Sequence, residues 1–167
     1  LFSFAIPKTH VSIAVETDGK KSVFADADGK RFDPASLARP EAPKAEETSG
    51  FVSVPLVALA WARSGDKGDK ANVGVIARRP EYFPYICRSL TEGVAAERFA
   101  HFLKGDVDRF VMPGSNALNF LLHNVLGGGG VASLRNDPQG KGYSQLLLDA
   151  PIEVPAALAK RDKLPAA

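Results

Sequence analysis

The sequence predicts an α+β fold in which two helices cover one face of a mainly antiparallel sheet. Three observations support this prediction. Short apolar runs bounded by glycine, proline and polar residues recur along the chain and are typical of strands. Two longer segments place apolar residues at helical spacing. From residue 51 onward the predicted order is strand, strand, helix, strand, helix, strand, strand, and packing both helices on the sheet gives a ferredoxin-like sandwich.

The N-terminal segment, residues 1–32, is predicted to contain a β-hairpin. Residues 9–15 alternate polar and apolar side chains, and the pattern resumes at residues 21–25 after Asp18-Gly19. Asp-Gly is a favoured hairpin turn because both positions tolerate positive φ. Asp28-Gly29 predicts a second turn. The chain does not begin with methionine, so we expect it to be trimmed or to be the downstream piece of a longer protein.

Two segments are predicted to lack regular structure. Residues 33–50 contain Pro34, Pro40 and Pro43 among alanine, glutamate and lysine, with little apolar periodicity, and this composition predicts a linker or extended arm. Residues 156–167 are rich in alanine, lysine and proline, and we expect a flexible tail.

The compact domain is predicted to span residues 51–155. Its first half contains strands at residues 54–63 and 73–78, a helical turn within residues 80–89, and a helix at residues 91–103. The apolar face of this helix consists of Ala95, Phe99, Phe102 and Leu103.

The second half of the domain begins with a strand at residues 107–112. A second helix is predicted to follow, with Ser115 as its N-cap. Its apolar stripe consists of Leu118, Leu121, Leu122 and Val125. Two more strands, at residues 131–134 and 143–148, are predicted on either side of a turn at residues 137–140.

Composition excludes several classes of protein. The formal net charge is only +2, and residues 51–167, with 14 basic and 11 acidic groups, contain no basic block of the kind that binds nucleic acid. The apolar runs are too short to span a membrane. Cys87 is the only cysteine, so the chain has neither an internal disulfide nor a cysteine metal site, which fits the cytoplasm.

The first candidate site is the polar stretch from Arg63 to Asn72, which is predicted to be a loop longer than a hairpin turn needs. The candidate binding residues in it are Arg63, Ser64, Gly65, Asp66, Lys67, Gly68, Asp69 and Asn72. Glycines let backbone N–H groups converge on an anion, and the cations add charge. Alternatively, Asp66, Asp69 and Asn72 supply oxygens to a divalent ion, or the aspartates only cap their own turns.

The second candidate site is the glycine run at residues 127–130 with the polar residues that follow it. The candidate binding residues are Gly128, Gly129, Arg135 and Lys141. Four glycines exceed what a helix end needs and permit close approach of a ligand or another chain segment, although a flexible reversal explains them equally well. The spacing fits neither a Walker loop nor a dinucleotide fingerprint.

The remaining polar residues suggest no catalytic group. Asn116, Asn119 and His123 repeat at helical spacing and predict an exposed face of the second helix. His10 and His101 stand alone, and Cys87 is expected to be buried. We therefore assign no catalytic residue, metal or cofactor.

Several motifs resemble the small domain of the acyclic terpene utilisation (AtuA-like) family. They are Arg-Ser-Gly-Asp-Lys-Gly-Asp-x-x-Asn-x-Gly-Val-Ile-Ala from Arg63, Pro-Gly-Ser-Asn-Ala-Leu-Asn-Phe-Leu-Leu from Pro113, Leu-Gly-Gly-Gly-Gly from Leu126, and Ser-Leu-Arg-x-Asp-x-x-Gly-Lys from Ser133. The resemblance covers residues 54–148. It implies a ferredoxin-fold module that is fused behind a large N-terminal domain or occurs as a short separate protein, and a role in the breakdown of branched or terpenoid acyl-CoA compounds. It brings no established catalytic residues.

Two functional hypotheses follow. In the first, the chain is a domain or subunit of a cytoplasmic enzyme complex that acts on acyl-CoA or terpenoid acids. Its two polar loops would face each other at one end of the sheet and bind an anionic group of the substrate, such as a CoA phosphate or an acyl carboxylate of a possible CoA thioester, through Arg63, Lys67 and Arg135. Asp66 and Asp69 would hold the lysines and the turn in place. In the second, the chain is a non-catalytic assembly module whose glycine-rich loops and N-terminal arm pack against a larger partner subunit. In both, we expect an oligomer.

Overall fold

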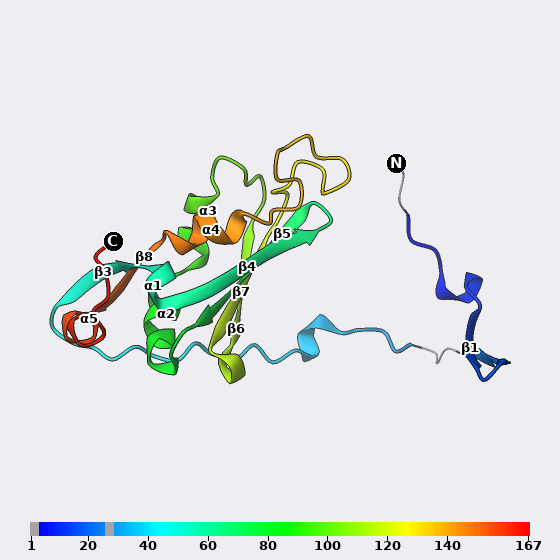
Figure 1. The fold of residues 1–167 in the computed structure, drawn as a ribbon, viewed down its shortest axis with the longest axis horizontal. Helices are drawn as coiled ribbons and strands as arrows, with labels where there is room; N and C mark the ends of the chain where they lie inside the picture. The colour runs from blue at the N-terminus through cyan, green and yellow to red at the C-terminus, as the bar shows by residue number, and fades with distance from the viewer. Residues whose placement is uncertain (1–3, 26–28) are drawn as a thin grey trace. The chain divides into compact units, whose positions relative to one another are not determined.

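The computed structural model of the chain, shown in Figure 1, describes residues 4–25 and 29–167. The chain divides into two compact units, Leu1–Ala38 and Arg39–Ala167, and each is described by itself. In the described part of the chain, no helix is long and apolar enough to cross a membrane.

The first unit contains the predicted hairpin. Strands β1 (Ile13–Thr17) and β2 (Lys20–Phe24) pair antiparallel, and the turn residues Asp18 and Gly19 have φ values of 52° and 74°. Both values lie in the left-handed region that a type I′ turn requires at its two central positions. Two short 3₁₀ segments, η1 (Lys8–His10) and η2 (Pro34–Ser36), flank the hairpin. The predicted turn at Asp28-Gly29 lies partly outside the described residues.

The second unit is built on a four-stranded antiparallel sheet. Its strands are β4 (Ala60–Lys67), β5 (Lys70–Ala77), β6 (Val107–Met112) and β7 (Ala117–Leu122), in the spatial order β4-β5-β7-β6. The strands join as two hairpins, and the hairpins meet where β5 pairs with β7. Apolar side chains alternate along the strands, and those on one face of the sheet pack into the hydrophobic core.

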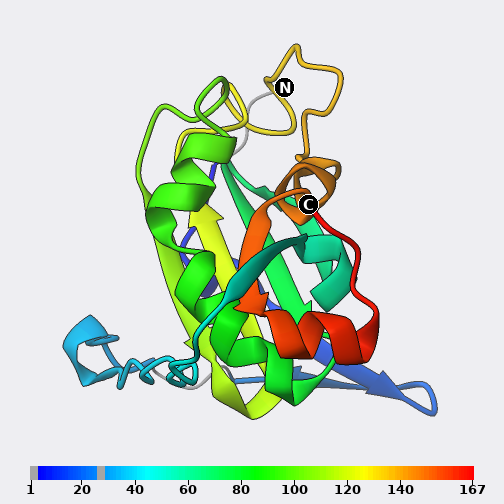
Figure 2. The same ribbon diagram turned by 90° about the vertical axis from the view of Figure 1, so that its left-hand side faces the viewer.

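Helices lie on one face of this sheet, as Figure 2 shows. They are α2 (Phe83–Ser89), α3 (Glu92–Arg98) and α4 (Tyr143–Leu148). Thr91 caps α3 because its side-chain oxygen accepts a hydrogen bond from the backbone N–H of Val94. Arg109 on β6 donates to the carbonyl oxygens of Cys87 and Leu90, which lie at the end of α2 and have no partner within the helix. The α+β class and the antiparallel sheet covered by helices on one side are confirmed.

The second unit also contains a separate two-stranded sheet. Strands β3 (Phe51–Pro55) and β8 (Pro151–Pro155) pair antiparallel, and the short helix α1 (Leu56–Leu59) separates β3 from β4. The predicted strand at residues 54–63 is therefore two strands with a helical turn between them. Residues 156–167 differ from the expected flexible tail, because they begin with helix α5 (Ala156–Asp162), and the backbone N–H of Ala167 donates to the carbonyl oxygen of Ser53.

The predicted second helix after Ser115 is wrong, because this segment is strand β7. Leu118, Phe120 and Leu122 point into the core and alternate with half-exposed residues, which is a strand pattern within the same sequence. A turn decides between the two patterns. The 3₁₀ segment η4 (Pro113–Ser115) ends at Asn116 in the left-handed conformation, with φ of 49°, and closes a hairpin between β6 and β7.

The predicted strands at residues 131–134 and 143–148 are also wrong. The first segment is part of an irregular loop, and the second is helix α4. The carboxylate of Asp137 accepts hydrogen bonds from the backbone N–H groups of Lys141 and Gly142, at 2.9 and 2.8 Å, just before α4 begins. These N–H groups would otherwise lack partners at the start of a helix, so the predicted Asp137 turn introduces a helix and not a strand.

Candidate anion-binding site

The polar stretch from Arg63 to Asn72 is not a long loop but the paired ends of β4 and β5. Gly65 lies opposite Asn72 and Lys67 lies opposite Lys70, so only Gly68 and Asp69 form the turn. Gly68 has φ of 69°, as the first central residue of a type II′ turn does. Polar side chains fit in strands here because one face of the sheet carries no helix, so they reach solvent.

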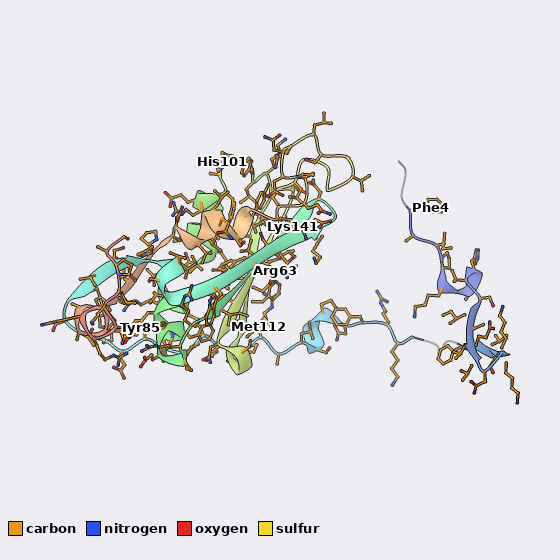
Figure 3. The ribbon with its side chains drawn as sticks, in the orientation of Figure 1. Phe4, Arg63, Tyr85, His101, Met112 and Lys141 are labelled. Atoms are coloured by element: carbon orange, nitrogen blue, oxygen red, sulfur yellow. The ribbon has the colours of Figure 1, made fainter. Side chains whose placement is uncertain are left out.

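Strand alternation collects several predicted residues around one pocket on this open face. Arg63, Gly65 and Lys67 follow one another at two-residue spacing on β4. The pocket has a volume of about 340 Å³, and Figure 3 labels two of its residues, Arg63 and Lys141. Its lining residues are Arg63, Ser64, Gly65, Lys67, Asn72, Gly74 and Lys141.

The charge of this pocket is entirely positive. Arg63, Lys67 and Lys141 are its charged lining residues, and no carboxylate lines it. Among residues 4–25 and 29–167, no ion pair joins any of the three cations to an acidic side chain. The Lys67 ammonium instead donates to the backbone oxygen of Asp66 at 2.7 Å. Cations that are not neutralised by the protein are available to an anion.

Two glycines leave space for the pocket. A Cβ atom added to Gly65 would lie 3.1 Å from the Lys141 Nζ, so the bare backbone of Gly65 lets the lysine ammonium lie across β4. Gly74 stands opposite Arg63 in the register and carries no side chain into the space beside the guanidinium. A Cβ on Gly74 would find only an ordinary contact, with the Arg63 carbonyl oxygen at 3.8 Å. The glycine at position 74 is therefore not required by the fold.

Ser64 positions Lys141. The Ser64 hydroxyl donates to the backbone oxygen of Lys141 at 3.0 Å and accepts from the backbone N–H of Ser144 at 2.9 Å. Both hydrogen bonds join β4 to the start of α4, and the hydroxyl is buried. Ser64 therefore lines the pocket, but its hydroxyl is committed to the protein.

Asp66 and Asp69 do not hold the lysines as expected. The Asp69 carboxylate accepts a hydrogen bond from the backbone N–H of Gly128 at 2.8 Å. Asp66 lies on the helix-covered side of β4, where a Cβ added to Gly130 would be 3.4 Å from its Oδ2. Asn72 points to the opposite face and donates to Asn119, so the three side chains do not converge on one ion. The described residues include no metal-binding group of three or more histidine, cysteine or acidic side chains.

The glycine run contacts the β4–β5 turn. A Cβ added to Gly129 would lie 2.9 Å from the carbonyl oxygen of Gly68, and Gly129 also has φ of 89°. No other residue fits this position without strain. The two predicted loops therefore meet at one end of the sheet, but Gly128 and Gly129 pack on the turn and do not line the cationic pocket.

Arg135 also lies outside the lining of this pocket. Its guanidinium donates to the backbone oxygen of Val125 and, at 3.4 Å, to the Tyr143 hydroxyl. It is centred 5.1 Å from the ring of Phe102 and packs against Gly127. Burial raises the pKa of the Tyr143 phenol, and Arg135 partly opposes this shift. The position of Arg135 is that of a residue that holds the glycine-rich loop against the domain.

The other polar residues occupy several different places. His123 directly follows β7, and its Nε2 is 2.9 Å from a carboxylate oxygen of Asp108 on β6. Asn119 accepts a hydrogen bond from Asn72. Cys87 is buried, and burial raises the pKa of its thiol to about 11, so it is a poor nucleophile. Gly74 lines the pocket but was missed, because only the strand register reveals that it faces Arg63.

Comparison with family models matches residues 54–153 to the AtuA ferredoxin-like domain. No curated protein and no solved structure matches the chain. The matched region contains the four-stranded sheet, its three helices, both predicted loops and the cationic pocket. Because the match extends over more than half of the residues, this chain belongs to the family of AtuA ferredoxin-like domains.

Proposed function

We propose that the chain is a domain or subunit of a cytoplasmic enzyme complex that acts on acyl-CoA or terpenoid acids. In this proposal the pocket on the open sheet face binds an anionic group of the substrate, such as a CoA phosphate or an acyl carboxylate. Membership of the AtuA ferredoxin-like family supports a link to acyclic terpene utilisation. The observation that carries the binding role is the group of three cations in a pocket that no carboxylate lines.

The number of cations matters because each is partly exposed to solvent. An exposed charge pair contributes up to about 1 kcal/mol, so a single lysine would bind an anion only very weakly. Three cations around one group contribute up to roughly 3 kcal/mol together, which corresponds to on the order of a hundredfold in affinity. Arg63 adds geometric selectivity, since its planar guanidinium can engage two oxygens of a phosphate or carboxylate at once.

A partner supplies the chemistry in this proposal. Within the described residues, the pocket lining contains no histidine, cysteine or acidic side chain that could serve as a base or nucleophile beside the bound anion. The catalytic groups would then come from a larger partner subunit or an upstream domain, and the chain would work within an oligomer.

Calorimetric titration with CoA tests the binding role. We expect the affinity to fall about fivefold in each of the variants Arg63→Ala, Lys67→Ala and Lys141→Ala, because each loses a contact of about 1 kcal/mol between an exposed charge and the anion. Lys160→Ala is the matched control, since it removes an exposed cation on α5 that does not line the pocket. An affinity that is unchanged in all three pocket variants, or absence of binding to the unmodified chain, would contradict the proposal.

An assembly module is the alternative proposal. Trp61, Ile76 and Met112 occupy one cross-strand row of the open face, and each exposes about half of its surface, at 55%, 49% and 49%. Exposed apolar rows of this kind occur at protein interfaces. The native mass of the complex purified from its cells distinguishes the two: a stable hetero-oligomer that forms without any CoA binding favours assembly, and a monomer that binds CoA excludes it.

A further inference from the structure

An aromatic side chain lies beside the cationic pocket on the same strand. Trp61 precedes Arg63 by two residues on β4, so both side chains project from the open face, about 7 Å apart along the strand. Trp61 exposes 55% of its surface, although a tryptophan side chain gains from being covered. Its position suggests that a flat group of the bound ligand covers it.

Arg78 holds the indole ring in place. The Arg78 guanidinium lies 4.6 Å from the centre of the Trp61 ring, and its Nε donates to the backbone oxygen of Val57 at 3.1 Å. Because this arginine is itself anchored, it fixes the ring that it stacks on. A ring that is already oriented loses less conformational freedom when a ligand binds to it.

The charge of the pocket favours a diphosphate over a single carboxylate. Three cations line a pocket of about 340 Å³. Gly65 and Gly74 also line it and contribute no side chain that would fill it. A carboxylate carries one negative charge and would leave two of these cations unpaired. A diphosphate ester offers several oxygens and a charge of about two, which matches the pocket more closely.

We propose that the open face of β4 binds a nucleoside diphosphate group, with the diphosphate between Arg63, Lys67 and Lys141 and the base stacked on Trp61. The inference rests on the proposed anion site and adds the class of ligand. One sugar unit separates base and diphosphate in such a ligand, as one two-residue step of the strand separates Trp61 from Arg63. Both ADP and CoA contain this group.

The experiment uses the fluorescence of Trp61, which is the only tryptophan of the chain. The chain is titrated with ADP, CoA and inorganic pyrophosphate, and each affinity is also measured by calorimetry. We expect ADP or CoA to quench the fluorescence and to bind about tenfold more tightly than pyrophosphate, because stacking adds a contact that pyrophosphate lacks. Tighter binding of CoA than of ADP would identify CoA as the source of the group.

Three variants locate the contacts. Trp61→Leu should bind ADP no more tightly than pyrophosphate, whereas Trp61→Phe should keep part of the difference. Arg63→Ala should weaken both ligands. Met112→Leu is the control for the open face, since it changes an exposed apolar side chain on β6 away from Arg63. Met112→Leu should leave all affinities unchanged.

The outcomes separate this inference from the proposed function. If pyrophosphate binds and responds to Arg63→Ala, while ADP neither quenches Trp61 nor binds more tightly, the base site is wrong and the anion site stands. If no anion binds at all, the inference and the proposed function both fail. If Trp61→Leu leaves the preference for ADP intact, the base lies elsewhere and the inference is overturned.

Discussion

The carboxylate of Asp69 accepts a hydrogen bond of 2.8 Å from the backbone N–H of Gly128, a residue 59 positions away in the sequence. The backbone oxygen of Asp69 also accepts one from Val125 at 3.0 Å. Through these two contacts the β4–β5 turn holds the start of the glycine-rich loop. Asp69 therefore links the β4–β5 turn to the glycine-rich loop, and it does not neutralise a nearby lysine.

Replacement of Asp69 by alanine is expected to destabilise the domain by about 1–2 kcal/mol, because the Gly128 N–H loses a charged acceptor. Asp69→Asn keeps a side-chain oxygen at the same position and should retain most of the stability. Urea denaturation of the three proteins measures the difference. Equal loss in both variants would show that the carboxylate charge, and not the hydrogen bond, is what matters.

Gly129 is expected to tolerate no side chain. Gly129→Ala would place a Cβ atom 2.9 Å from the Gly68 carbonyl oxygen and would force a left-handed φ on alanine, so we expect a loss of about 2–4 kcal/mol. Gly114→Ala is the control, because a Cβ there meets no atom within 4 Å and the φ is not positive. Its free energy of unfolding, measured by urea denaturation, should stay within about 0.5 kcal/mol of the value for the unmodified protein. Similar stability of the two variants would refute the close approach.

Arg135 should contribute to stability more than to binding. Its guanidinium bonds to the Val125 carbonyl and the Tyr143 hydroxyl, so Arg135→Ala is expected to cost about 1.5–3 kcal/mol. The affinity for pyrophosphate should change less than twofold at a temperature where the variant is folded. Arg63→Ala should weaken the binding of pyrophosphate and leave the stability nearly unchanged, since the Arg63 guanidinium has no ion pair with a described residue. Loss of pyrophosphate binding in a folded Arg135→Ala variant would show that Arg135 contributes to anion binding.

The contacts of Asp162 predict a dependence of stability on acid. Hydrogen bonds from Arg161 and Tyr82, at 2.8 and 2.7 Å, hold the pKa of this carboxyl well below its ordinary value. A carboxyl with a lowered pKa in the folded state stabilises the protein above its unfolded pKa of about 3.9, and this contribution is lost as the pH falls below that value.

Asp162→Asn should therefore flatten the decline in stability below about pH 4, when the free energy of unfolding is measured from pH 7 downward. Asp149→Asn is the control, since it removes an exposed carboxylate outside the cluster around Asp162. The same decline in the free energy of unfolding at acid pH in the unmodified chain and in Asp162→Asn would contradict this role of Asp162.

The sequence predicted those elements whose signals are local. The strand at residues 107–112 has the bounds of β6, and the helix predicted from residue 91 is α3 with Thr91 as its cap, although it ends earlier. The segment from Ser115 to Val125 was misassigned because its leucines satisfy helical and strand spacing together. Only the left-handed turn at Asn116 and the pairing with β6 and β5 select the strand, and neither is visible in spacing.

The candidate site was predicted in part for a similar reason. Arg63, Lys67 and Lys141 meet in one pocket, and two of them are close in sequence. The contribution of Gly74 depends on the register of β5, and the placement of Arg135 depends on how the loop folds back onto Phe102. Neighbours across a sheet and packing within an irregular loop are tertiary relationships, which residue spacing along one chain does not determine.

The burial of Cys87 makes this domain a suitable background for chemical labelling. The only thiol of the chain is 4% exposed, and its raised pKa of about 11 leaves almost no thiolate at neutral pH. A cysteine introduced on the open face, for example by Met112→Cys, would react alone with a dye or spin label while the domain stays folded. Under denaturant Cys87 would react as well, so the rate at which it is modified would measure how often α2 opens from the sheet.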